Sequence, residues 1–158
     1  MSNTSPESSE ALSQEQEVDR LVGLVGYQLR RSYFFSIQLF ASATTGLDIT
    51  PIQYGILETI LESEVLAQKD IAERLGSPPQ SVVPLIRNLE DRGLVERVRS
   101  EVDRRRHLLA LTKHGLALLA ETRERVAGVE ADLARDFTPG DRSKLLDLLH
   151  RLRRDPPE

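Results

Sequence analysis

The chain has 158 residues, of which 39% are hydrophobic and 29% charged, and its formal net charge is −4 at pH 7. This composition predicts one folded domain, or one domain with extensions, and it excludes a wholly disordered chain and a membrane-spanning helix. Because the sequence contains no cysteine, disulfides, thiolate metal sites and thiol-based redox sensing are excluded as well.

The N-terminal segment MSNTSPESSEALSQEQE is polar and acidic and contains no apolar signal segment. We therefore expect a cytoplasmic protein without a membrane partner. Residues 1–14 show no apolar periodicity and are predicted to form a disordered tail. From Val18 to Phe40 the apolar residues recur mostly at steps of three and four, which predicts one long amphipathic helix reaching about Ser42.

The start of the next helix is encoded locally. Thr50 is a favourable N-cap, Pro51 suits the first helical position, and Gln53 completes a capping box. This helix is expected to run to about Glu64.

A helix-turn-helix is predicted next. A third helix is expected over residues 67–75, ended by Gly76. Ser77 and Gln80 have the spacing of a second capping box, so another helix is expected to begin there and to stop near Gly93. Two helices joined by about three residues around a glycine have the layout of a helix-turn-helix.

The pattern then changes to β-favouring residues. The segments 94–100 and 104–112 are short, contain valine, leucine and threonine, and are separated by three residues, which predicts a β-hairpin. The basic charge of the chain gathers in this region and in the helix-turn-helix, because residues 66–115 carry 10 basic and 7 acidic side chains. Any phosphate contact is expected there.

Two further helices follow the hairpin. A long one is expected from Thr112 to about Phe137, with leucines and valines largely at helical spacing. Thr138 and Asp141 form a further capping motif, which opens a last amphipathic helix over residues 139–154.

The predicted fold is therefore mainly α, with α+β character from a two-stranded wing. A winged helix-turn-helix lobe over residues 49–112 is flanked by an N-terminal dimerisation helix at 15–48 and C-terminal dimerisation helices at 113–158. The flanking helices carry apolar stripes that a small lobe with its own core does not need. A second copy of the chain would bury them, which predicts a homodimer; in the alternative they fold back on their own lobe.

The recognition helix is the first candidate site. Recognition helices read base edges in the major groove with their N-terminal half, where this chain carries Gln80 and Ser81, with Ser77 just before and Arg87 further on. In the alternative interpretation, Gln80 serves only to complete the helix cap.

The wing is the second candidate site. Arg104, Arg105 and Arg106 stand at the tip of the predicted hairpin, where arginine can enter the negative potential of the minor groove. Asp103 and Arg105 are two residues apart on an extended strand and so point to one side, which lets the carboxylate orient an arginine.

These motifs resemble, in order and spacing, those of the MarR family (multiple antibiotic resistance regulators), from about Leu21 to Val126. The matching segments are ITPIQYGIL, QKDIAERLG, SVVPLIRNLEDRGLVER and DRRRHLLALTKHG. The pattern L-E-x-x-G-L-V-x-R, followed by D-x-R and L-T-x-x-G, is carried by Leu89, Glu90, Gly93, Leu94, Val95, Arg97, Asp103, Arg105, Leu111, Thr112 and Gly115.

The resemblance implies a homodimeric transcription factor, mostly a repressor, on a pseudo-palindromic operator of double-stranded DNA. It implies that Arg105 enters the minor groove and that Asp103 holds it or a neighbouring arginine. It also implies release by a small phenolic or aromatic anion in a cleft lined by the first two helices. The candidate ligand-binding residues are Tyr33, Phe34, Ile37 and Tyr54, each with ordinary core or interface packing as its alternative.

Pro84 in the recognition helix leaves a second function open. Proline removes an N–H that would bond to the carbonyl of Gln80 and tends to kink a helix. The alternative to an operator-binding regulator is therefore a winged-helix protein-interaction module, or a regulator with impaired DNA binding.

An enzyme is not expected, because the sequence has no phosphate-binding glycine loop and no nucleophile motif. Its three histidines, His107, His114 and His150, lack the spacing of metal ligands, so neither a metal nor a cofactor is expected.

Overall fold

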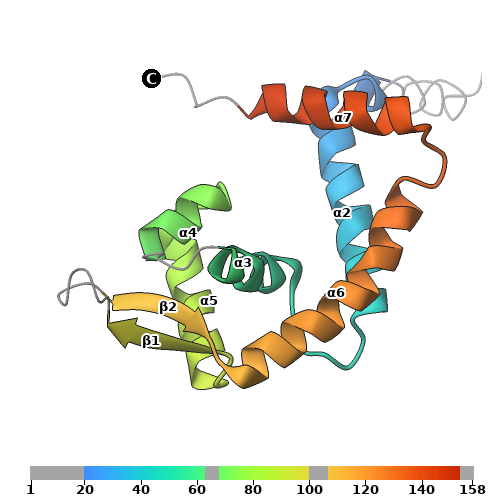
Figure 1. Ribbon diagram of the computed structural model, residues 1–158. Helices are drawn as coiled ribbons and strands as arrows, with labels where there is room; N and C mark the ends of the chain where they lie inside the picture. Colours follow the sequence, from blue (N-terminus) through green and yellow to red (C-terminus); the bar gives the residue numbers. More distant parts are fainter. Residues whose placement is uncertain (1–19, 63–67, 100–106, 154–158) are drawn as a thin grey trace, which may run out of the picture. The chain divides into compact units, whose positions relative to one another are not determined.

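The computed structural model describes residues 20–62, 68–99 and 107–153, and the chain divides into two compact units, residues 1–39 and 40–158 (Figure 1). The predicted tail at 1–14 and the wing tip lie outside the described residues. The elements, in chain order, are α2 (Val25–Ala43), α3 (Pro51–Leu61), α4 (Gln68–Arg74), α5 (Pro79–Asp91), β1 (Val95–Arg99), β2 (His107–Leu111), α6 (Lys113–Leu133) and α7 (Pro139–Leu152).

The expectation of one unbroken helix from Val18 to Ser42 is wrong. Residues 20–22 are helical, the helix is interrupted at Gly23 and Leu24, and α2 begins at Val25. Glycine is a poor helix former, so the break falls at the residue that least favours helix continuation. The side-chain amide of Gln28 donates to the backbone oxygen of Val22 at 2.6 Å, which satisfies a carbonyl near the end of the first segment.

Two of the three predicted capping boxes are confirmed. Thr50 accepts from the amide of Gln53 at 3.3 Å, and the side chain of Gln53 accepts from the amide of Thr50 at 2.9 Å. Thr138 and Asp141 make the same reciprocal pair at the start of α7. Helix α3 ends at Leu61, three residues before the expected end.

The third box, Ser77 with Gln80, is not formed, and that prediction is wrong. Pro79 excludes the helical conformation at the residue before it, and Pro78 accordingly has φ −57° and ψ 136°. The helix therefore has Pro78 as its N-cap, one residue later than expected, and no side chain caps it. The hydroxyl of Ser77 instead lies 3.4 Å from the backbone oxygen of Leu75.

Helix α5 continues through Pro84 without a break and starts five residues before it. The proline is exposed, whereas Val82, Ile86 and Leu89 are buried on the opposite side. The recognition helix is therefore one continuous helix, with the proline ring on its outer face.

The wing is an antiparallel pair, β1 with β2, in a register that places Val95 opposite Leu111 and Val98 opposite Leu108. With six described α-helices and this single two-stranded sheet, the fold is mostly helical, as predicted. None of the described helices combines the length and the apolar character of a membrane span.

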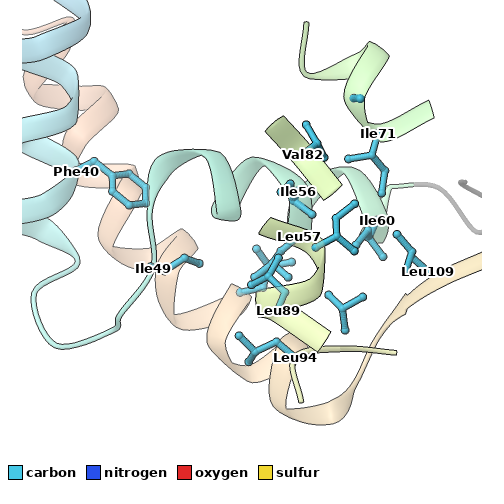
Figure 2. Close-up of a cluster of buried hydrophobic side chains, with 14 residues drawn as sticks. Phe40, Ile49, Ile56, Leu57, Ile60, Ile71, Val82, Leu89, Leu94 and Leu109 are labelled. Atoms are coloured by element: carbon cyan, nitrogen blue, oxygen red, sulfur yellow. The ribbon is translucent and has the colours of Figure 1, made fainter. Parts of the chain in front are cut away.

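Helix α3 lies at the centre of the core of the second unit (Figure 2). It contacts α4, α5, α6 and β2, and its side chains Ile56, Leu57 and Ile60 are nearly or fully buried. Burying one such side chain contributes about 1.5–3 kcal/mol relative to exposure. The helix-turn-helix and the wing are thus held on one apolar core, which also includes Ile71, Ala72, Val82, Ile86, Leu89, Leu94, Val95, Leu109 and Leu119.

Candidate nucleic-acid interface

The outer face of α5 carries the predicted base-reading residues. Gln80, Ser81, Pro84 and Arg87 are exposed, on the side opposite the buried residues of this helix. Ser77 is half-buried in the turn before the helix. Pro78 gives no side-chain cap, Pro79 carries no N–H, and the amide of Ser81 donates to the backbone oxygen of Pro78 at 2.9 Å. This leaves the amide of Gln80 to solvent or to a bound anion, and a helix N-terminus favours negative charge.

The base of the wing is built by the L-T-x-x-G motif. The hydroxyl of Thr112 donates to the backbone oxygen of Gly93 at 2.6 Å and accepts from the amide of Gly115 at 3.0 Å. The amide of Thr112 donates to the backbone oxygen of Leu94 at 3.1 Å. Gly115 is buried, and a Cβ added to it would collide with the carbonyl of Leu94. The motif therefore holds the start of α6 in close contact with the start of β1.

The preceding motif also has a structural explanation. Arg97 of β1 donates from Nε to Glu90 of α5 at 2.6 Å, and a second guanidinium nitrogen lies 3.2 Å from the other carboxylate oxygen. A bidentate pair of this kind fixes the relative orientation of the two side chains in addition to pairing their charges. It ties the wing strand to the recognition helix.

The wing tip itself lies outside the described residues. Strand β1 ends at Arg99 and β2 begins at His107, so the predicted residues Asp103, Arg104, Arg105 and Arg106 belong to the segment between them in the sequence.

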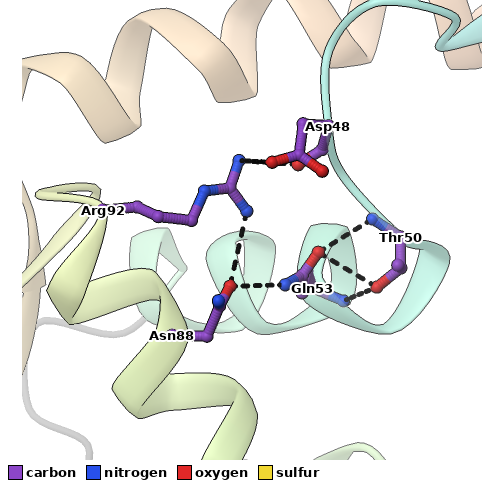
Figure 3. Close-up of polar contacts among 5 residues, drawn as sticks. All are labelled: Asp48, Thr50, Gln53, Asn88 and Arg92. Atoms are coloured by element: carbon purple, nitrogen blue, oxygen red, sulfur yellow. Dashed lines mark hydrogen bonds and ion pairs between the residues drawn. The ribbon is translucent and has the colours of Figure 1, made fainter.

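A polar network behind the recognition helix was not predicted (Figure 3). The amide of Gln53 donates to the side-chain oxygen of Asn88 at 3.0 Å, and Arg92 donates to the same oxygen at 3.5 Å. Arg92 also reaches the backbone oxygen of Asp48 at 2.6 Å and its carboxylate at 3.5 Å. Only the capping role of Gln53 was expected from the sequence, because the contacts of Gln53 with Asn88 and of Arg92 with Asp48 join residues 35 and 44 positions apart.

Tyr54, a predicted ligand residue, belongs to a charged cluster between α3 and α6. Arg123 donates to both carboxylate oxygens of Glu58, at 2.8 and 2.5 Å. These hydrogen bonds hold the pKa of Glu58 below its ordinary value. Burial raises the pKa of Tyr54 to about 12, and its hydrogen bond to Glu58 acts in the same direction. The phenol is therefore neutral near pH 7, and its ring lies against Phe40, with centroids 5.9 Å apart.

Replacing Glu58 by glutamine is expected to make the fold less sensitive to acid. Because the folded-state pKa of Glu58 is lowered, its ion pair contributes stability that is complete above the unfolded-state pKa and is lost as the pH falls through the folded-state pKa. Thermal unfolding between about pH 6 and about pH 3 should show a smaller loss of Tm for Glu58→Gln than for the wild type. An equal loss in both proteins would contradict this contribution.

The other predicted ligand residues lie in the first unit. Tyr33 and Phe34 are exposed and make an edge-to-face pair with ring centroids 6.4 Å apart, and Ile37 is half-buried. The guanidinium of Arg30 lies 5.1 Å from the ring centre of Phe34. This part of α2 thus presents aromatic rings with a cation beside them, a combination that suits an aromatic anion.

Comparison with known proteins agrees with this architecture. The sequence profile described as MarR family matches residues 47–106. A putative transcriptional regulatory protein for the hcr operon of Thauera aromatica is 32% identical over 139 residues, which cover 87% of this chain and 84% of that protein. An organic hydroperoxide resistance transcriptional regulator of Bacillus subtilis is 36% identical over 89 residues, covering 56% of this chain and 60% of that protein.

Solved structures give the same result. The transcriptional repressor CouR bound to a 23-mer DNA duplex superposes with a TM-score of 0.77 at 33% identity, covering 85% of this chain and 95% of that one. The PcaV transcriptional regulator from Streptomyces coelicolor, in complex with its natural ligand, gives 0.77 at 26% identity, covering 84% and 93%.

The fold and the exposed recognition helix thus define a winged helix-turn-helix transcriptional regulator. The chain belongs to the MarR family. This is a family of transcription regulators and not of enzymes, in agreement with the sequence analysis.

Proposed function

We propose that the protein is a ligand-responsive repressor that binds a pseudo-palindromic operator as a homodimer and leaves it when a small aromatic effector binds. The observation that carries this proposal is the uncapped, exposed N-terminal half of α5, held on a rigid core beside the wing. The likeness to CouR, a repressor with a structure on a DNA duplex, supports it.

In the proposed complex α5 enters the major groove. Gln80 and Ser81 face base edges, Ser77 and the backbone amide of Gln80 face phosphate, and Arg87 contacts the groove or its edge. The wing residues Asp103, Arg104, Arg105 and Arg106 form the minor-groove contact, with Arg105 inserted and Asp103 orienting it.

The apolar faces of the flanking helices support a homodimer. In α2 and the segment before it, and separately in α7, large hydrophobic side chains are between 40% and 62% exposed. Large exposed apolar side chains in this number are unusual on a monomer and typical of an interface. The residues are Leu21, Val22, Leu24, Val25, Leu29, Tyr33, Phe34 and Phe35, and in α7 Leu145, Leu146, Leu148 and Leu152.

An aromatic effector is supported by the relatives and by α2. CouR has also been determined bound to p-coumaroyl-CoA, in a structure that is 31% identical to this chain over 96% of its length. In this chain Tyr33, Phe34, Ile37 and Tyr54 are the proposed ligand residues. We therefore include both aromatic carboxylic acids and their coenzyme A thioesters among the effector classes.

The proposal is tested by release of the protein from the DNA upstream of its own gene. Bound complexes are titrated with a panel of aromatic acids and their thioesters, and light scattering gives the mass of the free protein. We expect twice the 17.8 kDa of one chain and release by at least one panel member. A monomer would refute the dimer, and binding that no panel member relieves would refute the effector class. No binding at all would favour the alternative, a protein-interaction module or a regulator impaired by Pro84.

A further inference from the structure

Two arginines from different helices hold the loop between α2 and α3. Arg92, the C-cap of α5, donates to the backbone oxygen of Asp48 at 2.6 Å. Arg125 of α6 donates to the backbone oxygen of Thr45 at 2.9 Å. Asp48 has φ 45°, in the left-handed region that residues other than glycine rarely occupy. Its conformation is therefore one that surrounding contacts must maintain.

The contact made by Arg92 extends into the recognition helix. Asn88, one turn earlier in α5, accepts from Arg92 and from the amide of Gln53, which is itself held by the capping box with Thr50 (Figure 3). Gln53 is 7% exposed, so its amide donor depends on Asn88 rather than on water. These bonds join the C-terminal half of α5 to the start of α3 and to the loop before it.

We propose that Arg92 and Asn88 are positioning residues for DNA binding. They set the orientation in which α5 presents its N-terminal half to the groove, and they pass displacements of the α2–α3 loop to that helix. Both residues lie outside the N-terminal half that reads bases in helix-turn-helix proteins, so they act through the helix and not by contact with DNA. The inference rests on the proposed operator binding.

The loop contact also gives a route for regulation. The loop follows directly on α2, which carries the proposed effector residues Tyr33, Phe34 and Ile37. A shift of the end of α2 reaches α5 through Asp48 and Arg92. Hydrogen-bond networks can carry coupling of this kind between two elements, and the hydrogen bonds of Asp48, Arg92 and Asn88 form one.

A matched pair of arginine variants tests the proposal. Arg92→Met keeps the aliphatic stem and removes the donors. Arg125→Met removes the other arginine from the same loop and leaves the contacts of α5 intact. We expect Arg92→Met to weaken operator affinity about 10-fold and Arg125→Met to change it by less than about 2-fold. Affinities are compared per active molecule, with the active fraction taken from stoichiometric titration.

The salt dependence separates positioning from a direct phosphate contact. A lost phosphate contact lowers the slope of log affinity against log salt by about 1, whereas a lost positioning contact leaves the slope unchanged. We expect an unchanged slope for Arg92→Met, and for Asn88→Ala weaker binding with an unchanged slope.

Three results would overturn the inference. Wild-type affinity in both Arg92→Met and Asn88→Ala would overturn it while leaving operator binding by the wild type intact. A lower slope for Arg92→Met would reveal a direct phosphate contact instead. Failure of the wild type to bind its upstream DNA would contradict the proposed function, and this inference with it.

Discussion

Replacing Gly115 by alanine is expected to lower the free energy of unfolding by about 3 kcal/mol or more, or to prevent the DNA-binding lobe from folding. The added Cβ would overlap the carbonyl group of Leu94, which is backbone and cannot rotate away. Relief requires α6 to move from the base of β1, which would break the bonds that Thr112 donates to the backbone oxygens of Gly93 and Leu94.

The same helix provides a matched control. Gly128 also lies in α6, and a Cβ added there meets no atom within 4 Å. Gly128→Ala should be neutral or stabilise the protein by up to about 1 kcal/mol, because alanine favours the helix. Urea denaturation followed by circular dichroism measures both variants. If Gly115→Ala lay within about 1 kcal/mol of the wild type, the account of the L-T-x-x-G motif would be wrong.

Replacing Arg105 by alanine is expected to weaken operator binding by about 1–3 kcal/mol, which is about 5- to 150-fold in affinity. The reason is the loss of a cation from the minor groove, where a narrow groove concentrates negative potential. Fold stability should not change, because the buried core is formed by other residues.

Arg135→Ala is the control for charge. Arg135 is an exposed arginine after the end of α6, paired with Asp132 at 2.5 Å, and it lies outside the proposed interface. A fluorescence anisotropy titration of upstream DNA should give wild-type affinity for this variant. Equal affinities for Arg105→Ala and the wild type would remove the wing from the proposed interface.

Local signals in the sequence predicted most of the fold. The Thr50–Gln53 and Thr138–Asp141 boxes form because each needs only side chains three residues apart. The box expected at Ser77 failed because the two prolines after it delay the helix, a backbone effect that outweighs the side-chain pattern. The apolar periodicity continues across Gly23, where the helix is interrupted. Periodicity indicates which face of a helix is apolar, and it does not indicate whether the backbone stays helical.

The candidate site was predictable only in part. Gln80, Ser81 and Arg87 are exposed on α5, and their contact with DNA stays a prediction. The bonds of Arg92 to Asp48 and of Gln53 to Asn88 join distant segments, and polar residues in a sequence do not indicate their partners. The composition of the chain predicted basic charge in this lobe, but it did not predict these hydrogen bonds of α5.

The protein is proposed to bind its operator in a sequence-specific way, and this specificity can be measured on two duplexes. The wild-type affinity for the DNA upstream of its own gene is compared with that for a shuffled duplex of equal length and composition, between about 50 mM and about 200 mM salt. We expect upstream DNA to be bound at least about 1,000-fold more tightly, with both affinities falling steeply as salt rises. Equal affinity for the two duplexes across the salt range would contradict the claim.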